Sequence, residues 1–407
     1  MLALDDRSSS RSGRRGLAVA LLLFTVTALV LGVFTQDRVD IDAKGFLFML
    51  DRGDVVRAEH PLYLPTAAAV GRVTGLFGGG PTAALAWTSA LGAGGGVAGT
   101  FLLARGLGRS RELAVGAALL VASSPGLLFH GSRIEVHALH LGVLALGAAM
   151  AFGPHKRLAT HLLAAVVGLD LAFLVHETSV ILAPAWVLAT AALWPQTGEG
   201  EPRRIRRRVR IVLSASVLGL GGLLAILAWG PMRVELLDGG GEHATRLIDY
   251  AWHVGWGRSF LEGLLLPLGL LLPLGLFGLA RTPRRDRRWL GAAIGVSLAL
   301  LFLWRVPELG GYTIALLPFL TLAAVVALPR RGRVAWLAVV VAVQGAIGVA
   351  FVSVHDSVLD PDDRAEAVRR CVGDGGVLVT ALPFGRPIEL DLHGVQPVRI
   401  EIGRAHV

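Results

Sequence analysis

Long apolar runs without charged residues alternate with short basic clusters along most of the chain. The clearest of these runs cover residues 17–34, 211–230, 264–280 and 334–352. A helix needs about 20 apolar residues to cross the roughly 30 Å hydrocarbon core of a bilayer, and these runs have about that length. The pattern therefore predicts an all-α polytopic membrane protein.

The basic clusters predict how the spans are oriented. Arg and Lys are enriched on the cytoplasmic side of membrane proteins. Here they gather in the N-terminal segment and at residues 105–111, 155–157, 203–210, 281–288 and 330–333. If all of these clusters lie inside, alternation gives about 11 transmembrane helices, with the N-terminus in the cytoplasm and the C-terminus outside.

Three segments decide that count. Residues 112–128 and 259–280 are each expected to form one span. Residues 64–77 are short for a span and carry Arg72, so we expect a helix that lies at the outer interface. With these assignments, each basic cluster falls on the cytoplasmic side.

The chain thus divides into three parts. Residues 1–16 form a basic cytoplasmic N-terminus, and residues 17–353 form the transmembrane domain, with a first external loop at 36–63. Residues 354–407 lack a long apolar run and are predicted to form a small extracytoplasmic α/β tail. The predicted elements of this tail are an amphipathic helix and three strands, at residues 360–370, 377–382, 388–392 and 398–402.

Composition supports a membrane location. Hydrophobic residues make up 54% of the chain and charged residues 17%, with a mean hydropathy of +0.62. The net charge is +9, and the basic residues lie in short clusters between apolar runs rather than on one polar domain. This distribution argues against nucleic-acid binding. The single cysteine, Cys371, cannot form a disulfide within the chain.

The first external loop holds the strongest candidates for chemistry. Asp40 and Asp42 follow the first span closely, where a carboxylate can reach both a membrane-bound substrate and water. A carboxylate in such a place can act as a general base. Glu59, His60 and Tyr63 close the same loop. The plainer interpretation of these charges is a solvated acidic loop.

Further polar residues fall on the same predicted outer side. They are Arg133, Glu135, His137, His176, Glu177 and Arg305. An arginine at the outer end of a span can bind a lipid phosphate or can anchor the helix at the interface. The chain contains no nucleotide-binding or cysteine-based metal motif, so no metal ligand or cofactor is assigned, although the site is compatible with a divalent metal.

These same segments resemble a known group of proteins. Residues 58–65, AEHPLYLP, are similar to the "HPPGYPLY" segment of bacterial protein O-mannosyltransferase-like membrane proteins, a family of the GT-C glycosyltransferase superfamily. Further similar segments follow in the family's order at residues 87–107, 124–139, 168–179 and 304–318. The resemblance departs from the family at Thr88, where Asn is usual, and at His137, where Tyr is usual.

The resemblance implies a GT-C-like fold and an inverting glycosyltransferase in the bacterial plasma membrane. Such an enzyme moves a sugar, with mannose as the candidate, from a polyprenyl-phosphate donor to a hydroxyl of a protein, glycan or lipid acceptor. Asp42 aligns best with the family's catalytic aspartate, and Asp40 is the second candidate. The implied substrate-binding residues are Glu59, His60, Tyr63, Arg133, Glu135, His137, His176, Glu177 and Arg305.

Two other functional classes stay open. A transporter or lipid flippase would place its site near the bilayer midplane on broken helices, and Pro267 and Pro273 could break one. The charges, however, collect at one predicted edge of the membrane domain. The other alternative is a non-catalytic assembly protein.

Overall fold

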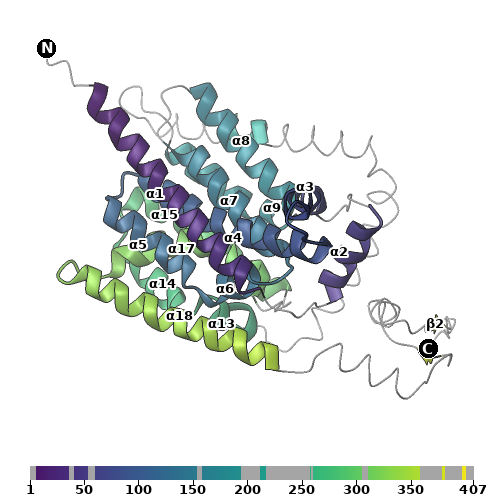
Figure 1. The fold of residues 1–407 in the computed structure, drawn as a ribbon. Helices are drawn as coiled ribbons and strands as arrows, with labels where there is room; N and C mark the ends of the chain where they lie inside the picture. The colour runs from purple at the N-terminus through teal and green to yellow at the C-terminus, as the bar shows by residue number, and fades with distance from the viewer. Residues whose placement is uncertain are drawn as a thin grey trace, which may run out of the picture.

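The computed structural model describes residues 6–35, 41–53, 60–153, 158–193, 211–216, 257, 260–304, 310–357, 378–380 and 397–399. The described part is predominantly helical (Figure 1). Its first helices are α1 (Asp6–Val33), α2 (Ile41–Asp51), α3 (Tyr63–Gly75), α4 (Pro81–Gly106), α5 (Arg111–Ala122), α6 (Pro125–Gly131), α7 (Val136–Phe152), α8 (Leu158–Val175) and α9 (Ser179–Ala192). The later ones are the π-helical turn η2 (Leu261–Leu265), α13 (Leu266–Leu268), α14 (Leu271–Arg281), α15 (Arg284–Trp304), α16 (Gly311–Ile314), α17 (Leu317–Ala327) and α18 (Arg333–Ser357).

Helix α4 lies at the centre of one half of the bundle, between α1 and α7, and α7 also packs against α8 (Figure 1). Glycines at the helix contacts allow this close packing. A Cβ atom on Gly92 of α4 or on Gly142 of α7 would overlap the backbone of the other helix. Gly147 of α7 and Gly168 of α8 make a second close pair, in which each added Cβ would lie within 3.0 Å of the partner's Cα and carbonyl oxygen. Small residues commonly mediate such close helix contacts in membrane proteins, where the hydrophobic effect contributes little between helices.

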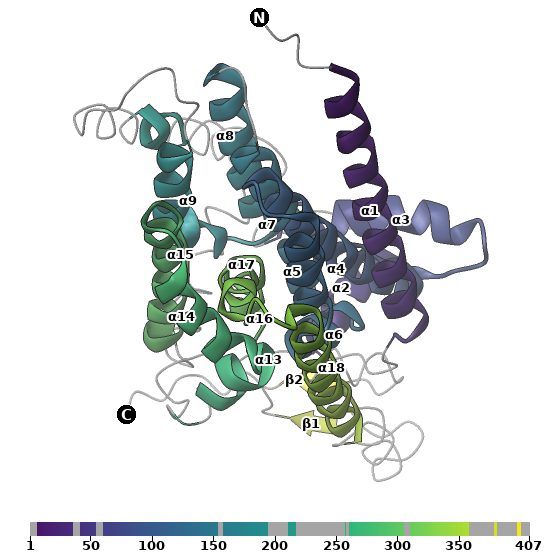
Figure 2. The same cartoon turned by 90° about the vertical axis from the view of Figure 1, so that its left-hand side faces the viewer.

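The other half of the bundle is built around α17, which packs against α14 on one side and α5 on the other (Figure 2). Helix α15 packs against α9, and so connects the two halves.

Two helices of the described part are long and apolar enough to cross a membrane by themselves, over Arg15–Val33 and Arg333–Ser353. Both coincide with runs expected to span. Two bent pairs raise this number to four if each pair counts as one span. Shorter apolar helices, such as α7, α9 and α17, also occur, so a helical membrane protein is supported, whereas a count of 11 spans is not confirmed.

The segments 112–128 and 259–280 were each expected to form one span, and each contains a sharp bend. Helices α5 and α6 meet at 61° because Ser124 caps α6 by accepting a hydrogen bond from the Leu127 amide at 3.3 Å, with Pro125 as its first residue. The second break, of 73°, separates residues 261–268 from α14 and occurs at Gly269, whose φ is +51°. It lies two residues after Pro267, whereas Pro273 is accommodated within the first turn of α14.

Gln344 of α18 forms hydrogen bonds with the backbone at this second break. Its side-chain oxygen accepts a hydrogen bond from the Leu270 amide at 2.8 Å, and its side-chain nitrogen donates one to the Leu268 carbonyl at 2.7 Å. A break in a helix leaves backbone groups without their partners, which is costly in an apolar environment. The fully buried Gln344 side chain supplies both partners.

We expect Gln344→Leu to destabilise the protein by about 2 kcal/mol or more, because each buried polar group left unsatisfied costs about 1–3 kcal/mol. A lower Tm of the detergent-purified protein measures this. Val343→Leu, on an exposed position of the same helix, is the matched control and should leave Tm almost unchanged. Equal Tm values for the two variants would show that the break does not depend on Gln344.

The short segment at residues 64–77 forms a helix, as expected. Helix α3 covers Tyr63–Gly75, and Leu76 and Phe77 beyond it are 80% and 86% exposed. Its place at a membrane interface stays a prediction.

In the tail, β1 (Leu378–Thr380) and β2 (Pro397–Arg399) overlap two of the three expected strands and pair in parallel. The third expected strand and the amphipathic helix lie outside the described residues, so the α/β tail as a unit stays a prediction.

Candidate functional site

The residues just before α3 are attached to the turn between α8 and α9. The amide of Leu62, just before α3, donates a hydrogen bond to the Leu174 carbonyl at the end of α8, at 3.0 Å. This contact brings His60 beside His176, which lies in the α8–α9 turn. Two polar segments far apart in the sequence therefore meet.

Four imidazoles converge there, and we call His60, His137, His140 and His176 the histidine cluster. His137 and His140 lie one turn apart at the start of α7, so they share a face. The ring of His176 lies 4.9 Å from that of His60, 5.1 Å from that of His137 and 5.2 Å from that of His140. His176 is thus the centre of the cluster.

The wall of the cluster comes from the other half of the bundle. Tyr312 of α16 lies edge-on to His137 at 5.6 Å and to His176 at 5.7 Å. The preceding residue must be small, because a Cβ atom on Gly311 would overlap the imidazole of His137. On the other side, Ser179 at the start of α9 lies 2.6 Å from His140, between Oγ and Nε2.

The electrostatics of His176 favour a neutral ring. Burial lowers the pKa of His176 well below its usual value of 6.5, and the neighbouring His137, His140 and His60 act in the same direction. The Thr178 amide donates a hydrogen bond to Nδ1 of His176 at 3.3 Å, and the Thr178 hydroxyl lies 2.9 Å from the same nitrogen. Because an amide can only donate, Nδ1 presents its lone pair.

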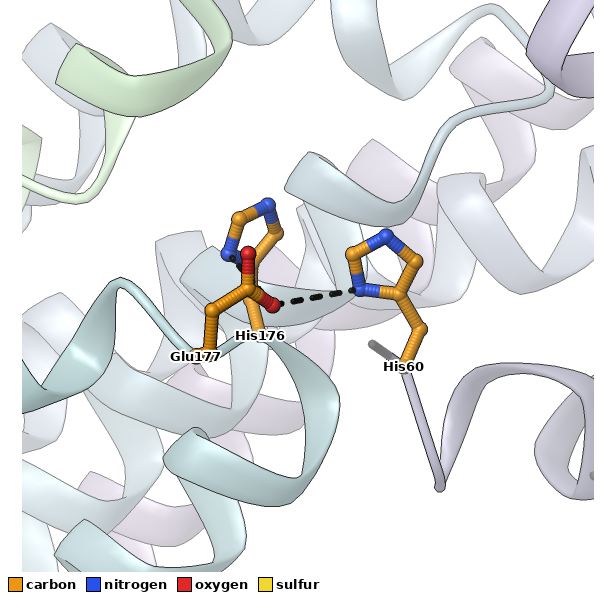
Figure 3. Close-up of side chains that lie close together, drawn as sticks. All are labelled: His60, His176 and Glu177. Atoms are coloured by element: carbon orange, nitrogen blue, oxygen red, sulfur yellow. Dashed lines mark ion pairs between the residues drawn. The ribbon is translucent and has the colours of Figure 1, made fainter. Parts of the chain in front are cut away.

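Glu177 brings a carboxylate to the edge of the cluster (Figure 3). Its Oε2 lies 3.8 Å from Nδ1 of His176 and 4.0 Å from Nδ1 of His60. The Glu177 side chain is 51% exposed, whereas that of His176 is 3% exposed. The carboxylate therefore stands between the buried imidazoles and solvent.

Helix α2 extends the site on the side of the first loop. Phe46 of α2 packs 4.7 Å from the ring of the fully buried Tyr63 and 6.1 Å from that of His60. Asp42 lies one turn before Phe46 in the same helix. Lys44 on the same helix is buried.

The expected site residues fall into three groups. His60, Tyr63, His137, His176 and Glu177 are brought together. Arg133 and Glu135 lie on the segment before α7, where the buried Arg133 guanidinium stands 4.6 Å over the Phe129 ring. The backbone of Glu135 is held by Ser89 of α4, which accepts from the Glu135 amide at 3.1 Å and donates to its carbonyl at 2.9 Å.

The third group lies outside the described residues. It consists of Asp40, Glu59 and Arg305. Of Asp42 only the backbone position in α2 is described. The roles assigned to all of the expected site residues, these four included, stay predictions.

The sequence analysis missed His130, His140, Tyr312 and Lys44 as site residues. His130 of α6 lies 5.1 Å from His137, ring to ring. His140 could have been found, because it stands three residues after His137 in a segment expected to be helical. Tyr312 had no such local signal, since its contact with the cluster depends on how the two halves of the bundle pack.

Known structures share this arrangement of helices. ArnT from Cupriavidus metallidurans superposes with a TM-score of 0.60 at 17% identity, over 95% of this chain and 86% of that chain. ArnT is a GT-C glycosyltransferase. The chain therefore shares the fold of ArnT. The same ArnT has also been solved with undecaprenyl phosphate bound, with the same TM-score.

The oligosaccharyltransferase AglB of Archaeoglobus fulgidus is a second similar structure. In its form tethered to an acceptor peptide it gives a TM-score of 0.54 at 13% identity, over 93% of this chain but only 63% of that chain. In complex with dolichol-phosphate and an inhibitory peptide it gives a TM-score of 0.51 at 13% identity, over 88% of this chain and 58% of that chain. No protein-family model matches the chain, and no curated protein sequence does.

Proposed function

We propose that the protein is an integral membrane glycosyltransferase that moves a sugar from a polyprenyl-phosphate-linked donor to an acceptor hydroxyl at the outer membrane face. The observation that carries this proposal is the fold that 95% of the chain shares with ArnT, whose structure is known with undecaprenyl phosphate bound. The histidine cluster and Glu177 supply polar groups where the first external loop meets the bundle.

In this proposal the carboxylates of the first loop carry the chemistry. Asp42, or Asp40 as the second candidate, accepts the proton of the acceptor hydroxyl while that oxygen attacks the anomeric carbon of the sugar. The lipid phosphate leaves with the electrons of the broken glycosidic bond, and the anomeric centre inverts. Stabilising that phosphate requires cations, and the buried Lys44 and Arg133 are candidates beside the predicted Arg305.

The remaining residues of the site orient the reactants. His60, His137, His176 and Tyr63 shape the inner wall, and Glu59, Glu135 and Glu177 are proposed to contact the sugar or the acceptor. The sugar, with mannose as the candidate, and the acceptor, a protein, glycan or lipid, are properties that the fold does not determine.

The decisive experiment supplies the purified protein with a radiolabelled polyprenyl-phosphate hexose and no nucleotide sugar. We expect release of polyprenyl phosphate together with transfer of the label to an acceptor, or to water when no acceptor is present. A His176→Ala variant should lose most of this release. If the donor stays intact with mannose and with other hexoses, in a lipid environment in which the protein is folded, transfer of a hexose from such lipids is excluded.

One observation favours the second candidate, a transporter or lipid flippase, namely the helix broken at Gly269. Gln344 occupies that break, however, with two hydrogen bonds to its backbone. Movement of a fluorescent polyprenyl phosphate across proteoliposome membranes, without sugar transfer, would support the transporter.

A further inference from the structure

Three side chains of the site present electron-donating atoms to one another. They are His60 before α3, and His176 and Glu177 in the α8–α9 turn (Figure 3). One donor atom from each lies within 4.8 Å of the other two. Two separations are shorter, since Oε2 of Glu177 lies 3.8 Å from Nδ1 of His176 and 4.0 Å from Nδ1 of His60.

The facing atoms of His176 and Glu177 are both hydrogen-bond acceptors. Nδ1 of His176 accepts a hydrogen bond from the Thr178 amide, so it carries a lone pair rather than a proton. The ring is buried, and a carboxylate oxygen lies 3.8 Å from the same nitrogen. Two electron-rich atoms thus face each other, and a cation between them would be attracted to both.

We infer that His60, His176 and Glu177 bind a divalent transition-metal ion of the zinc type. Two imidazole nitrogens and one carboxylate oxygen are the three-ligand donor set of zinc sites that keep a fourth position open. Tetrahedral bonds of about 2.0–2.2 Å place neighbouring ligand atoms about 3.3–3.6 Å apart. The observed separations of up to 4.8 Å exceed this by at most about 1.5 Å, which side-chain rotations can close.

Binding the ion changes few other contacts. Nδ1 of His176 exchanges its hydrogen bonds from Thr178 for the metal bond. His137 and His140 stack on His176 at 28° between ring planes, so its ring orientation is already restricted. The exposed Glu177 gives the ion an entry path from solvent.

The ion would join two segments that are distant in sequence. It would clamp the end of the first external loop to the α8–α9 turn, next to the backbone hydrogen bond between Leu62 and Leu174. The fourth position would take water or an anionic oxygen. If the proposed function holds, an oxygen of the donor phosphate is the candidate for that position.

The test of this site is the zinc content of the full-length protein, purified in detergent without a histidine tag. After removal of metals with a chelator and equilibration against buffered Zn²⁺, we expect one zinc per chain. Co²⁺ in its place should give the intense visible absorption of a tetrahedral site. Glu177→Gln and His60→Ala should each weaken binding at least tenfold, since even outer-shell changes cost about 10–100-fold at metal sites.

Two variants control for the other histidines and carboxylates of the chain. Glu112→Gln removes an exposed carboxylate of α5, and His161→Gln removes a buried imidazole of α8 that contacts the Thr190 carbonyl. Both should keep one tight zinc. Glu177 is exposed, so its variant is expected to fold, and a melting curve checks this.

The absence of stoichiometric zinc in the wild-type protein would overturn the inference, and so would undiminished binding in a folded Glu177→Gln variant. Because zinc is counted without any donor lipid, this outcome is independent of the transfer assay. A protein that binds zinc and transfers no sugar would keep the metal site and refute the proposed function.

Discussion

Replacing Asp42 with asparagine is expected to lower kcat for sugar transfer by about 10²–10⁴-fold, the usual contribution of a general base, with little change in donor binding. Asparagine keeps the size of the side chain and removes the proton acceptor. The position of Asp42 supports this choice, because it lies one turn before Phe46, whose ring contacts those of His60 and Tyr63.

The measurement is a steady-state comparison of kcat and donor KM with matched carboxylate variants. Asp51→Asn, at the exposed far end of α2, should leave both constants unchanged. Asp40→Asn should cost less than Asp42→Asn. If Asp40→Asn abolishes transfer while Asp42→Asn retains it, the base is Asp40. If neither variant slows an active preparation, the first loop does not supply the base.

The second large effect concerns the contact between α4 and α7. Gly142→Ala is expected to destabilise the protein by about 3 kcal/mol or more, at or above the upper end of the usual cost of overpacking. The new Cβ atom would overlap the carbonyl oxygen of Gly92 and lie 3.0 Å from its Cα. Backbone atoms cannot move aside as a side chain can, so the two helices would have to separate.

A large drop in Tm and loss of a monodisperse peak in gel filtration would report this effect. The matched control is Gly295→Ala in α15, where an added Cβ meets nothing within 4 Å. That change should be neutral or slightly stabilising, since alanine favours a helix over glycine by about 1 kcal/mol. Similar Tm values for both variants would mean that α4 and α7 can repack.

The sequence by itself determined the helical character of the chain and the position of several elements. The uncharged runs at residues 17–34 and 334–352 coincide with α1 and α18, because hydropathy over about 20 residues reports directly on what one helix can bury in lipid. The segment at 64–77 was also found as a helix, α3. These are local properties of each segment, which do not depend on the segments that pack against it.

Part of the site was equally visible in the sequence. His60, His137 and His176 were selected from three separate segments because each is a polar residue at the predicted outer end of an apolar run. Their meeting around His176 is a tertiary property. It depends on the α7–α8 packing and on the hydrogen bond between Leu62 and Leu174.

Only the tertiary structure decided where helices break and what completes the site. The segments 112–128 and 259–280 are apolar throughout most of their length, so hydropathy predicts one span from each and does not locate a bend. The second segment can break at Gly269 because Gln344, distant in sequence, satisfies the freed backbone groups. Tyr312 likewise joins the histidine cluster only because Gly311 lets α16 approach His137. A pattern along one segment reports how apolar it is, whereas hydrogen-bond partners and close approaches come from segments elsewhere in the chain.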